Sequence, residues 1–263
     1  APLLARQEQL GGRVDEGVAS LAARSKAIHA DLGKLVEEGP AKSHFRQVLG
    51  WLKLEPTLET AALLSLQDLI NGRPPLPRMT DFAMEPTALA AVVELVRSIP
   101  RARVLELGSG ASTVALAHAV KACGGSLVSV DHLEQYLEAT ARELARHPVQ
   151  DVATLRLATI QPVPGSDGSP WYDTAVVGGI EGQFDVLLVD GPPKAVGPHA
   201  RVPALPQLFD RLADGAWVIV DDANRKDERK MIADWREAYP ALGEPVKLSP
   251  RTVAMRLDRR GEG

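Results

Sequence analysis

The sequence contains few of the residues that mark several well-defined classes of protein. Among its 263 residues there is one cysteine, Cys123, which excludes an intrachain disulfide framework and any cysteine-rich zinc module. Aromatic residues make up 4% of the chain, which argues against a stacking platform for single-stranded nucleic acid. Lys and Arg number 30 against 34 Asp and Glu, a formal net charge of -4, so no basic excess favours nucleic acid as a partner. We therefore expect a protein of a reducing, cytoplasmic environment that binds no nucleic acid.

Long apolar runs are also missing. No run approaches the roughly 20 residues that span a bilayer. Residues 1–6 lack the basic-then-apolar order of a signal peptide. The shares of hydrophobic residues, 45%, and of charged residues, 24%, are those of a globular chain with a sizeable core. The sequence thus predicts a soluble protein with no membrane partner.

The first third of the chain has the pattern of a helix. Mostly apolar residues, separated by steps of four and three, form a stripe about three heptads long on one side of that helix. Its members are Val14, Val18, Leu21, Ser25, Ile28, Leu32 and Leu35. Such a helix either packs on its own domain or pairs two subunits as a homodimer, and the length of the stripe allows both.

A turn-forming segment marks the best boundary in the sequence. Residues 71–77 read Asn-Gly-Arg-Pro-Pro-Leu-Pro, and the glycine and prolines disfavour a continuing helix. We expect a helical N-terminal extension over residues 1–78, with a short coiled coil as one option. A single globular domain is expected over residues 79–263.

From about residue 84 onward, helical patterns alternate with short apolar runs. The runs read as strands at residues 103–107, 126–130, 152–157, 184–189, 216–220, 245–248 and 252–257. Helices are expected at residues 86–97, 112–121, 133–146, 204–212 and 227–239. This alternation predicts an α/β fold, a Rossmann-like, doubly wound sheet of seven mostly parallel strands with right-handed crossovers. In such sheets ligands bind beyond the carboxyl ends of the strands, so the residues after each strand are the candidates for chemistry.

The first predicted strand is followed by a short glycine-rich turn. Residues 106–113 read Glu-Leu-Gly-Ser-Gly-Ala-Ser-Thr, and the two glycines let the backbone turn tightly and approach a ligand. The next helix presents free N–H groups to that ligand. A dinucleotide fingerprint requires a third glycine where Thr113 stands, and the charge of Glu106 would repel phosphates. The turn therefore favours a cationic ligand over a pyrophosphate, with a plain glycine turn as the alternative.

Asp131 stands directly after the second predicted strand. A carboxylate at this place accepts hydrogen bonds from both hydroxyls of a ribose. The alternative is that Asp131 caps the helix that follows it, an ordinary role for aspartate. Together with Gly108 and Gly110, Asp131 favours a nucleoside site over two separate caps.

These residues resemble the cofactor half of class I S-adenosylmethionine-dependent methyltransferases. Further motifs resemble a bacterial subgroup that is similar in layout to the catechol O-methyltransferase-like enzymes and the sugar O-methyltransferases. They are Trp171-Tyr172, residues 189–193 (Val-Asp-Gly-Pro-Pro), residues 201–206 (Arg-Val-Pro-Ala-Leu-Pro) and residues 220–225 (Val-Asp-Asp-Ala-Asn-Arg). The resemblance covers about residues 80–257, so it implies that residues 79–263 form a methyltransferase domain with S-adenosylmethionine as its cofactor.

The resemblance also implies which residues hold the cofactor. Glu106, Gly108 and Gly110 would contact its methionine part, and Asp131 its ribose. Its adenine would lie near Ala158 and Thr159, which follow the third predicted strand. The remaining expected contacts come from the same strand ends and are Ser109, Ser112, His132 and Asp190.

Three carboxylates are expected at neighbouring strand ends. Asp190 follows the fourth predicted strand, and Asp221 and Asp222 follow the fifth. Parallel strands bring these groups to one rim, where their mutual repulsion requires a cation or a basic group. Catechol-type enzymes use acidic residues at the equivalent strand ends for a divalent ion, so the resemblance implies Mg²⁺ at Asp190, Asp221 and Asp222. In the alternative, the aspartate pair forms a turn with Arg225, and Asp190 only touches the cofactor.

The loop after Asp190 contains two candidates for a general base. Lys194 stands four residues after Asp190, one more than in the catechol enzymes, and a buried lysine there would accept a proton. His199 is the second candidate. For both, an exposed loop residue without a catalytic role is the alternative. The long connection over residues 161–182, rich in glycine and proline, is either a substrate lid or a disordered loop.

Together these features predict methyl transfer from S-adenosylmethionine to an oxygen of a small hydroxyl-bearing acceptor, a sugar or another metabolite. In that prediction Mg²⁺ assists, and Lys194 or His199 takes the proton. The alternative enzyme is an NAD(P)-dependent oxidoreductase built on the same type of sheet. The missing third glycine argues against it. The other alternative is a cofactor-binding scaffold without turnover. The helical extension would cover the acceptor site, pair two subunits or mark where a longer protein was cut.

Overall fold

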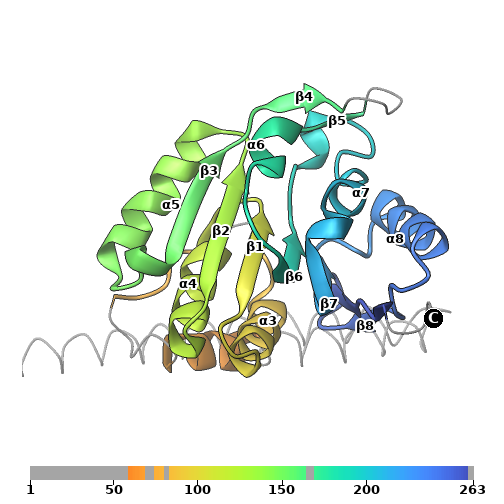
Figure 1. Ribbon diagram of the computed structural model, residues 1–263. Helices are drawn as coiled ribbons and strands as arrows, with labels where there is room; N and C mark the ends of the chain where they lie inside the picture. Colours follow the sequence, from red (N-terminus) through yellow and green to blue (C-terminus); the bar gives the residue numbers. More distant parts are fainter. Residues whose placement is uncertain (1–58, 69–73, 80–82, 164–168, 260–263) are drawn as a thin grey trace, which may run out of the picture. The chain divides into compact units, whose positions relative to one another are not determined.

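A sheet of seven strands forms the centre of the chain in the computed structural model, which describes residues 59–68, 74–79, 83–163 and 169–259 (Figure 1). The strand order is β3-β2-β1-β6-β7-β9-β8. The strands are β1 (Arg103–Leu107), β2 (Ser126–Asp131), β3 (Ala153–Leu157), β6 (Phe184–Val189), β7 (Leu212–Val220), β8 (Val246–Lys247) and β9 (Val253–Arg256). Neighbours from β3 to β7 are parallel, whereas β9 pairs antiparallel with both β7 and β8. The predicted doubly wound, mostly parallel sheet is therefore confirmed.

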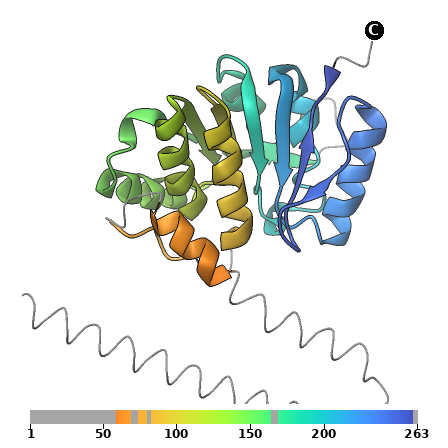
Figure 2. The same ribbon diagram turned by 90° about the horizontal axis from the view of Figure 1, so that it is seen from below.

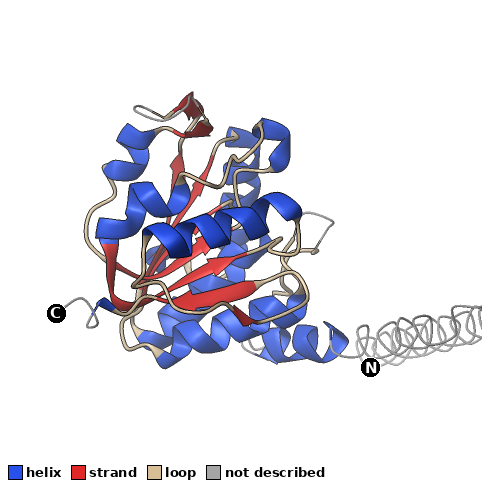
Figure 3. Ribbon diagram, turned by 90° about the vertical axis from the view of Figure 1, so that its right-hand side faces the viewer, coloured by secondary structure: helices blue, strands red, loops and turns tan. Residues whose placement is uncertain are grey.

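Helices cover both faces of this sheet (Figures 2 and 3). They are α3 (Pro86–Ser98), α4 (Ala111–Cys123), α5 (Glu134–Arg146), α6 (Thr174–Gly178), α7 (Ala204–Leu208) and α8 (Lys226–Ala238). One buried cluster joins α3 and α4 to Val104 and Val186, and another joins α7 and α8 to Leu105 and Leu187. Because neighbouring residues of a strand point to opposite faces, β1 and β6 supply both clusters. Among the helices described, none is long and apolar enough to cross a membrane.

The predicted strands at residues 103–107 and 184–189 have the observed bounds. The helix predicted over residues 204–212 is too long. After α7 the chain forms a 3-10 turn, Phe209–Arg211, and β7 begins at Leu212. Leu212 already pairs with Phe184 of β6, so the backbone has to be extended at this point.

Two of the residues described between positions 59 and 79 belong to the core. Residues 59–68 are helical, and Leu66 and Leu76 are buried in the same cluster as α3. The Glu59 carboxylate accepts hydrogen bonds from the backbone N–H and the hydroxyl of Thr87, at 2.9 and 2.7 Å. Part of the segment predicted as an extension therefore packs on the sheet domain. The apolar stripe of residues 14–35 and the homodimer prediction lie outside the described residues, and the boundary near residue 78 stays a prediction.

The connection over residues 161–182 contains regular structure. A hairpin of two short antiparallel strands, β4 (Ile160–Pro162) and β5 (Pro170–Tyr172), precedes α6. Trp171 and Tyr172 at the end of β5 are buried. Residues 164–168 lie outside the described ranges. In its described parts the connection is structured rather than a disordered loop, and its role as a lid stays a prediction.

Candidate functional site

The carboxyl ends of β1, β2, β6 and β7 surround a cavity of about 850 Å³. One part of its wall is the turn after β1 together with residues 131–136. The other part is the loop after β6, together with residues that follow β7 and with Arg251. This is where doubly wound sheets bind ligands, and the volume lies in the range of about 300–1,000 Å³ that is usual for ligand pockets.

Two glycines let the opposite parts of the wall approach each other. Gly108 has a backbone φ of 103°, in the left-handed region, and a Cβ atom there would lie 3.2 Å from the carbonyl carbon of Asp190. A Cβ atom at Gly191 would lie 3.2 Å from the Gly108 Cα and would collide with the Tyr172 hydroxyl. The turn after β1 and the loop after β6 therefore meet backbone to backbone, and only glycine fits at both positions.

Glu106 lies behind the turn after β1 and does not line the cavity. Its side chain is fully buried, and its two carboxylate oxygens accept hydrogen bonds of 2.6 Å from the hydroxyls of Ser112, Thr113 and Ser129. Burial raises the pKa of Glu106 from 4.5 to about 7; the three hydrogen bonds lower it, and Asp131 adds to the rise. The predicted contact of Glu106 with the methionine part of a cofactor stays a prediction, since the bonds that the structure shows for this carboxylate are those from the three hydroxyls. Through these bonds Glu106 holds the turn that lines the cavity.

Thr113 joins this carboxylate to the start of α4. Its hydroxyl donates to Glu106 and accepts a hydrogen bond of 2.9 Å from the backbone N–H of Gly110. Thr113 is fully buried, at the position where a dinucleotide fingerprint has its third glycine. The residues between Glu106 and Thr113 that were predicted to hold the cofactor do line the cavity: Gly108, Ser109, Gly110 and Ser112.

Asp131 ends β2 and faces the cavity with a carboxylate that is 5% exposed. One oxygen accepts a hydrogen bond of 3.0 Å from the backbone N–H of Ser109, and the other accepts one of 2.9 Å from Leu133. Leu133 is the N-cap residue of α5. Asp131 therefore bonds to the residue that begins α5 and lines the cavity, but its side chain does not cap the helix, and its contact with a ribose stays a prediction. His132 beside it also lines the cavity.

The two residues predicted to lie near the adenine are not part of the cavity wall. Ala158 is fully buried, and its N–H donates to the carbonyl of Asp131 at 2.9 Å, while Thr159 is exposed. Leu133 and Tyr136 line this end of the cavity instead, and both are exposed. Sequence reasoning missed them, although they stand three positions apart, at the N-cap and in the first turn of α5, and so lie on one side of the helix.

Tyr172 is a further wall residue that sequence reasoning did not assign. The side chain is 1% exposed, and its hydroxyl has no hydrogen-bond partner among the described residues. Burial raises the pKa of Tyr172 well above its usual range, and the charge of Asp131 adds to this effect. The hydroxyl therefore keeps its proton and is a donor without an acceptor. A buried donor of this kind calls for a partner, and a ligand in the cavity is the nearest candidate.

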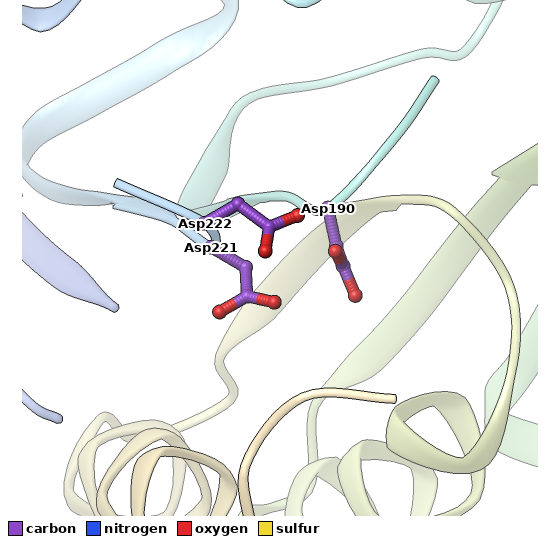
Figure 4. Close-up of side chains that lie close together, drawn as sticks. All are labelled: Asp190, Asp221 and Asp222. Atoms are coloured by element: carbon purple, nitrogen blue, oxygen red, sulfur yellow. The ribbon is translucent and has the colours of Figure 1, made fainter. Parts of the chain in front are cut away.

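The three predicted carboxylates come together at the ends of β6 and β7 (Figure 4). Oxygen atoms of Asp190, Asp221 and Asp222 lie within 4.8 Å of one another. Asp221 is fully buried, and Asp222 is nearly so. Burial, followed by repulsion from Asp221, raises the pKa of Asp190 well above its usual range, and Arg201 opposes this rise. Charges at this distance need compensation.

Arg201 supplies compensating charge at the centre of the cluster. Its side chain is 6% exposed, and Nη2 lies 3.3 Å from Asp190 Oδ1 and 3.2 Å from Asp222 Oδ2. The same guanidinium donates to three backbone carbonyls, those of Asp190, Pro192 and Asp221. Arg201 is therefore held firmly between the two strand ends.

Arg251 and Arg225 neutralise the outer oxygens of the cluster. Nη2 of Arg251 lies 3.2 Å from Asp221 Oδ2 and 3.1 Å from Asp222 Oδ1. Nη1 of Arg225 lies 2.8 Å from Asp222 Oδ2, which is the ion pair that the alternative interpretation expected. The remaining oxygen of Asp221 accepts a hydrogen bond of 2.6 Å from the Thr252 hydroxyl.

These contacts do not fit a divalent cation, although the spacing of the carboxylates alone would admit one. A hard cation binds carboxylate oxygens directly, at about 2.0–2.6 Å. Both oxygens of Asp221 and of Asp222, and one oxygen of Asp190, already accept hydrogen bonds from arginine or threonine. Three guanidinium groups also balance the charge of three carboxylates. We therefore derive no chemical step through a metal ion.

The structure separates the two candidates for a general base. Lys194 lines the cavity, but its side chain is 67% exposed and its Nζ lies 3.4 Å from Asp227 Oδ2. The burial on which the lysine prediction depended is therefore absent. His199 is exposed and lines a small neighbouring hollow of about 20 Å³ instead of the large cavity. A role of Lys194 or His199 in proton transfer stays a prediction.

Comparison with known proteins agrees with this geometry. Residues 105–223 match a family model described as a methyltransferase domain, whereas no curated protein matches the sequence. An SAH-bound methyltransferase of Podospora anserina, PaMTH1, is 15% identical, with 75% of this chain and 88% of that chain covered and a TM-score of 0.53. An O-methyltransferase of Bacillus cereus in complex with SAH is 16% identical, with 76% and 91% covered and a TM-score of 0.52. The O-methyltransferase TomG of Streptomyces achromogenes, involved in tomaymycin synthesis and in complex with SAM, is 16% identical, with 76% and 89% covered and a TM-score of 0.51. At these identities the likeness to solved structures shows the fold.

Proposed function

We propose that the chain is an S-adenosylmethionine-dependent methyltransferase that methylates an oxygen atom of a small hydroxyl-bearing acceptor; the match of residues 105–223 to a methyltransferase domain and the fold shared with SAH- and SAM-bound O-methyltransferases support this. One observation carries the proposal, namely the Asp131 carboxylate in the cavity wall beside the turn that begins at Gly108. A carboxylate at the end of the second strand suits the two hydroxyls of a ribose. The turn itself lets the backbone approach the rest of a nucleoside ligand closely.

S-adenosylmethionine supplies, when bound, a methyl group that is already activated for displacement. The task left to the chain is to hold the reacting groups in line. In the proposal, residues 108–112 and Asp131 hold the nucleoside end of the cavity, and the Tyr172 hydroxyl donates to a ligand oxygen. The loop from Asp190 to Lys194 orients the acceptor at the other end.

The choice of an oxygen acceptor is supported by the motif resemblance and by two similar structures whose names are those of O-methyltransferases. The acceptor end of the cavity is lined by Lys194, Arg225 and Arg251, which suit a polar compound such as a sugar. Lys194 is the proposed proton acceptor, since of the two candidates it alone lines this cavity. An enzyme that methylates an amine would bind the cofactor in the same way. Identification of the methylated atom in the product distinguishes an amine acceptor from a hydroxyl acceptor.

Two other functions make different predictions. An NAD(P)-dependent oxidoreductase would need room for a pyrophosphate, but the buried Thr113 side chain fills the place of the required glycine. A scaffold without turnover would bind the cofactor tightly and methylate nothing. Binding experiments therefore test the first alternative, and turnover tests the second.

Titration calorimetry with S-adenosylhomocysteine tests the proposal directly. We expect micromolar binding by the wild-type chain, and weakening by roughly 10- to 100-fold in Asp131→Ala, from the loss of charge-assisted hydrogen bonds. Asp234→Ala is the matched control, because Asp234 is an exposed aspartate on α8 whose ion pair is on the surface. Thermal unfolding of each variant shows that the proteins compared are folded.

The outcomes separate the three functions. Wild-type protein that binds NADH but not S-adenosylhomocysteine would refute the proposal in favour of an oxidoreductase. Tight binding of S-adenosylhomocysteine without turnover of S-adenosylmethionine on a broad panel of hydroxyl and amine acceptors would support the scaffold. Methylated product, with the site of methylation read by mass spectrometry, decides between oxygen and nitrogen.

A further inference from the structure

Arg201 occupies the space between the carboxylates of Asp190 and Asp222. One guanidinium nitrogen, Nη2, reaches both of them, at 3.3 and 3.2 Å. A cation that bridges two strand ends has to lie between their carboxylates, and here that place is taken by a side chain of the chain itself. The guanidinium is a permanent positive charge, because arginine keeps its proton in proteins.

The guanidinium cannot swing aside without loss of other bonds. Nε donates to the Pro192 carbonyl at 3.3 Å, Nη1 to the Asp221 carbonyl at 2.9 Å, and Nη2 to the Asp190 carbonyl at 2.7 Å. These carbonyls belong to both strand ends, and the side chain is almost completely buried. Rotation of Arg201 toward solvent would leave buried carbonyls without donors, which is costly.

The outer side of the cluster is closed as well. Each oxygen of Asp221 accepts a hydrogen bond, one from Thr252 and the other from Arg251, and Asp222 pairs with Arg251 and Arg225 as well as with Arg201. The charges of the three carboxylates are balanced by three guanidinium groups. A divalent cation added to this group would bring two positive charges that no remaining carboxylate of the cluster balances.

We propose that Arg201 permanently holds the position of a divalent cation between Asp190 and Asp222, so that methyl transfer by this chain is metal-independent. The first half of this inference concerns the carboxylate cluster alone, and the second half rests on the proposed function. Arg201 is then a positioning residue. It fixes Asp190 and the backbone of residues 190–192, which form the cavity wall that meets the turn at Gly108.

Binding of Mn²⁺ tests the inference without the need for an acceptor. The full chain, with excess S-adenosylhomocysteine present, is titrated with Mn²⁺, and free ion is measured by electron paramagnetic resonance. We expect no saturable binding by the wild-type chain at millimolar Mn²⁺. Arg201→Met keeps an unbranched apolar stem but removes the charge and the donors, and it should bind Mn²⁺ saturably. Adding Asp222→Asn to Arg201→Met should abolish this binding.

The controls address folding and unspecific charge effects. Arg229→Met removes an exposed arginine of α8 and should leave the chain unable to bind Mn²⁺. If circular dichroism shows that Arg201→Met does not fold, Arg201→Gln replaces it, since glutamine also removes the charge but keeps an amide that can donate to one of the buried carbonyls. If Arg201 had only a structural role, its replacement would not create a binding site for Mn²⁺. A gain of Mn²⁺ binding by either folded variant therefore distinguishes the two roles.

Two results would overturn the inference. One is saturable Mn²⁺ binding by the wild-type chain that Asp222→Asn removes. The other is a folded Arg201→Met or Arg201→Gln variant that still binds no Mn²⁺. Failure of the wild-type chain to bind S-adenosylhomocysteine would instead refute the proposed function, and the Mn²⁺ titration would still report on the carboxylate cluster. Where turnover is found, excess EDTA should leave its rate unchanged.

Discussion

The buried Glu106 should make the stability of this domain fall as the pH rises, and Glu106→Gln should remove that effect. The carboxyl group has a pKa of about 7 in the folded chain against an ordinary value of 4.5, chiefly because it is buried. The folded state therefore binds the proton more tightly than the unfolded state does. It follows that the stabilising contribution of this proton is complete below about pH 4.5 and is lost as the pH rises to about 7.

The magnitude comes from the difference between the two pKa values. A shift of roughly 2.5 units, at about 1.4 kcal/mol for each unit, corresponds to a loss of roughly 3 kcal/mol in the free energy of unfolding across this range. Glutamine has no proton to lose, so the variant lacks this slope. Its amide keeps one acceptor oxygen, and the hydroxyls of Ser112, Thr113 and Ser129 can turn to accept from its nitrogen.

Urea unfolding of both proteins at several pH values between about 5 and 8 measures this contribution. The quantity of interest is the difference between wild type and Glu106→Gln, because other titrating groups contribute equally to both. We expect Glu106→Gln to become more stable relative to wild type by up to about 3 kcal/mol as the pH rises. Glu237→Gln, on the exposed side of α8, is the control for the general effect of replacing a carboxylate by an amide. A difference for Glu106→Gln that stays constant between about pH 5 and 8 would show that Glu106 is ionised in the folded chain throughout, and the reasoning would be wrong.

Two further predictions concern the contact between Tyr172 and Gly191. Tyr172→Phe should leave the thermal stability of the ligand-free chain unchanged or slightly higher, because the buried hydroxyl has no partner, yet weaken S-adenosylhomocysteine binding by about 3- to 10-fold in calorimetry. Equal affinity of both proteins would show that the hydroxyl does not face the ligand. Gly191→Ala should lower the free energy of unfolding by roughly 1–3 kcal/mol, because its Cβ collides with that hydroxyl. Part of the loss should return in the double variant with Tyr172→Phe, and strictly additive effects would contradict the collision.

The sheet was predictable because each of its strands carries a local signal. Residues 103–107 and 184–189 are short apolar runs with glycine close behind them, and their bounds could be predicted without knowledge of their neighbours. The meeting of Asp190 with Asp221 and Asp222 was predictable for a related reason. Parallel neighbours end at the same edge of a sheet, so residues that follow them must be close.

The arrangement around these groups was not predictable, because it depends on where long side chains reach. Arg201 stands eleven positions after Asp190 (201 − 190) in a loop, and nothing in its spacing shows that the guanidinium returns to the strand end. Thr252 and Arg251 approach the cluster from the turn before β9, the antiparallel part of the sheet. The surroundings of Glu106 were not predictable for the same reason. Its position at the end of a strand suggests a ligand contact. Nothing in the sequence shows that three neighbouring hydroxyls donate hydrogen bonds to its carboxylate oxygens.

The hydroxyl of Thr113 separates two classes of cofactor on one sheet in a way that matters for protein engineering. A designer who wants to convert this site to a hydride carrier would replace Thr113 by glycine. That single exchange would also remove a donor from a fully buried carboxylate and the acceptor of the Gly110 N–H. A variant with this exchange alone would contain a buried Glu106 carboxylate that has lost one of its hydrogen-bond donors. A redesign toward a dinucleotide therefore has to treat residues 106 and 113 as a pair.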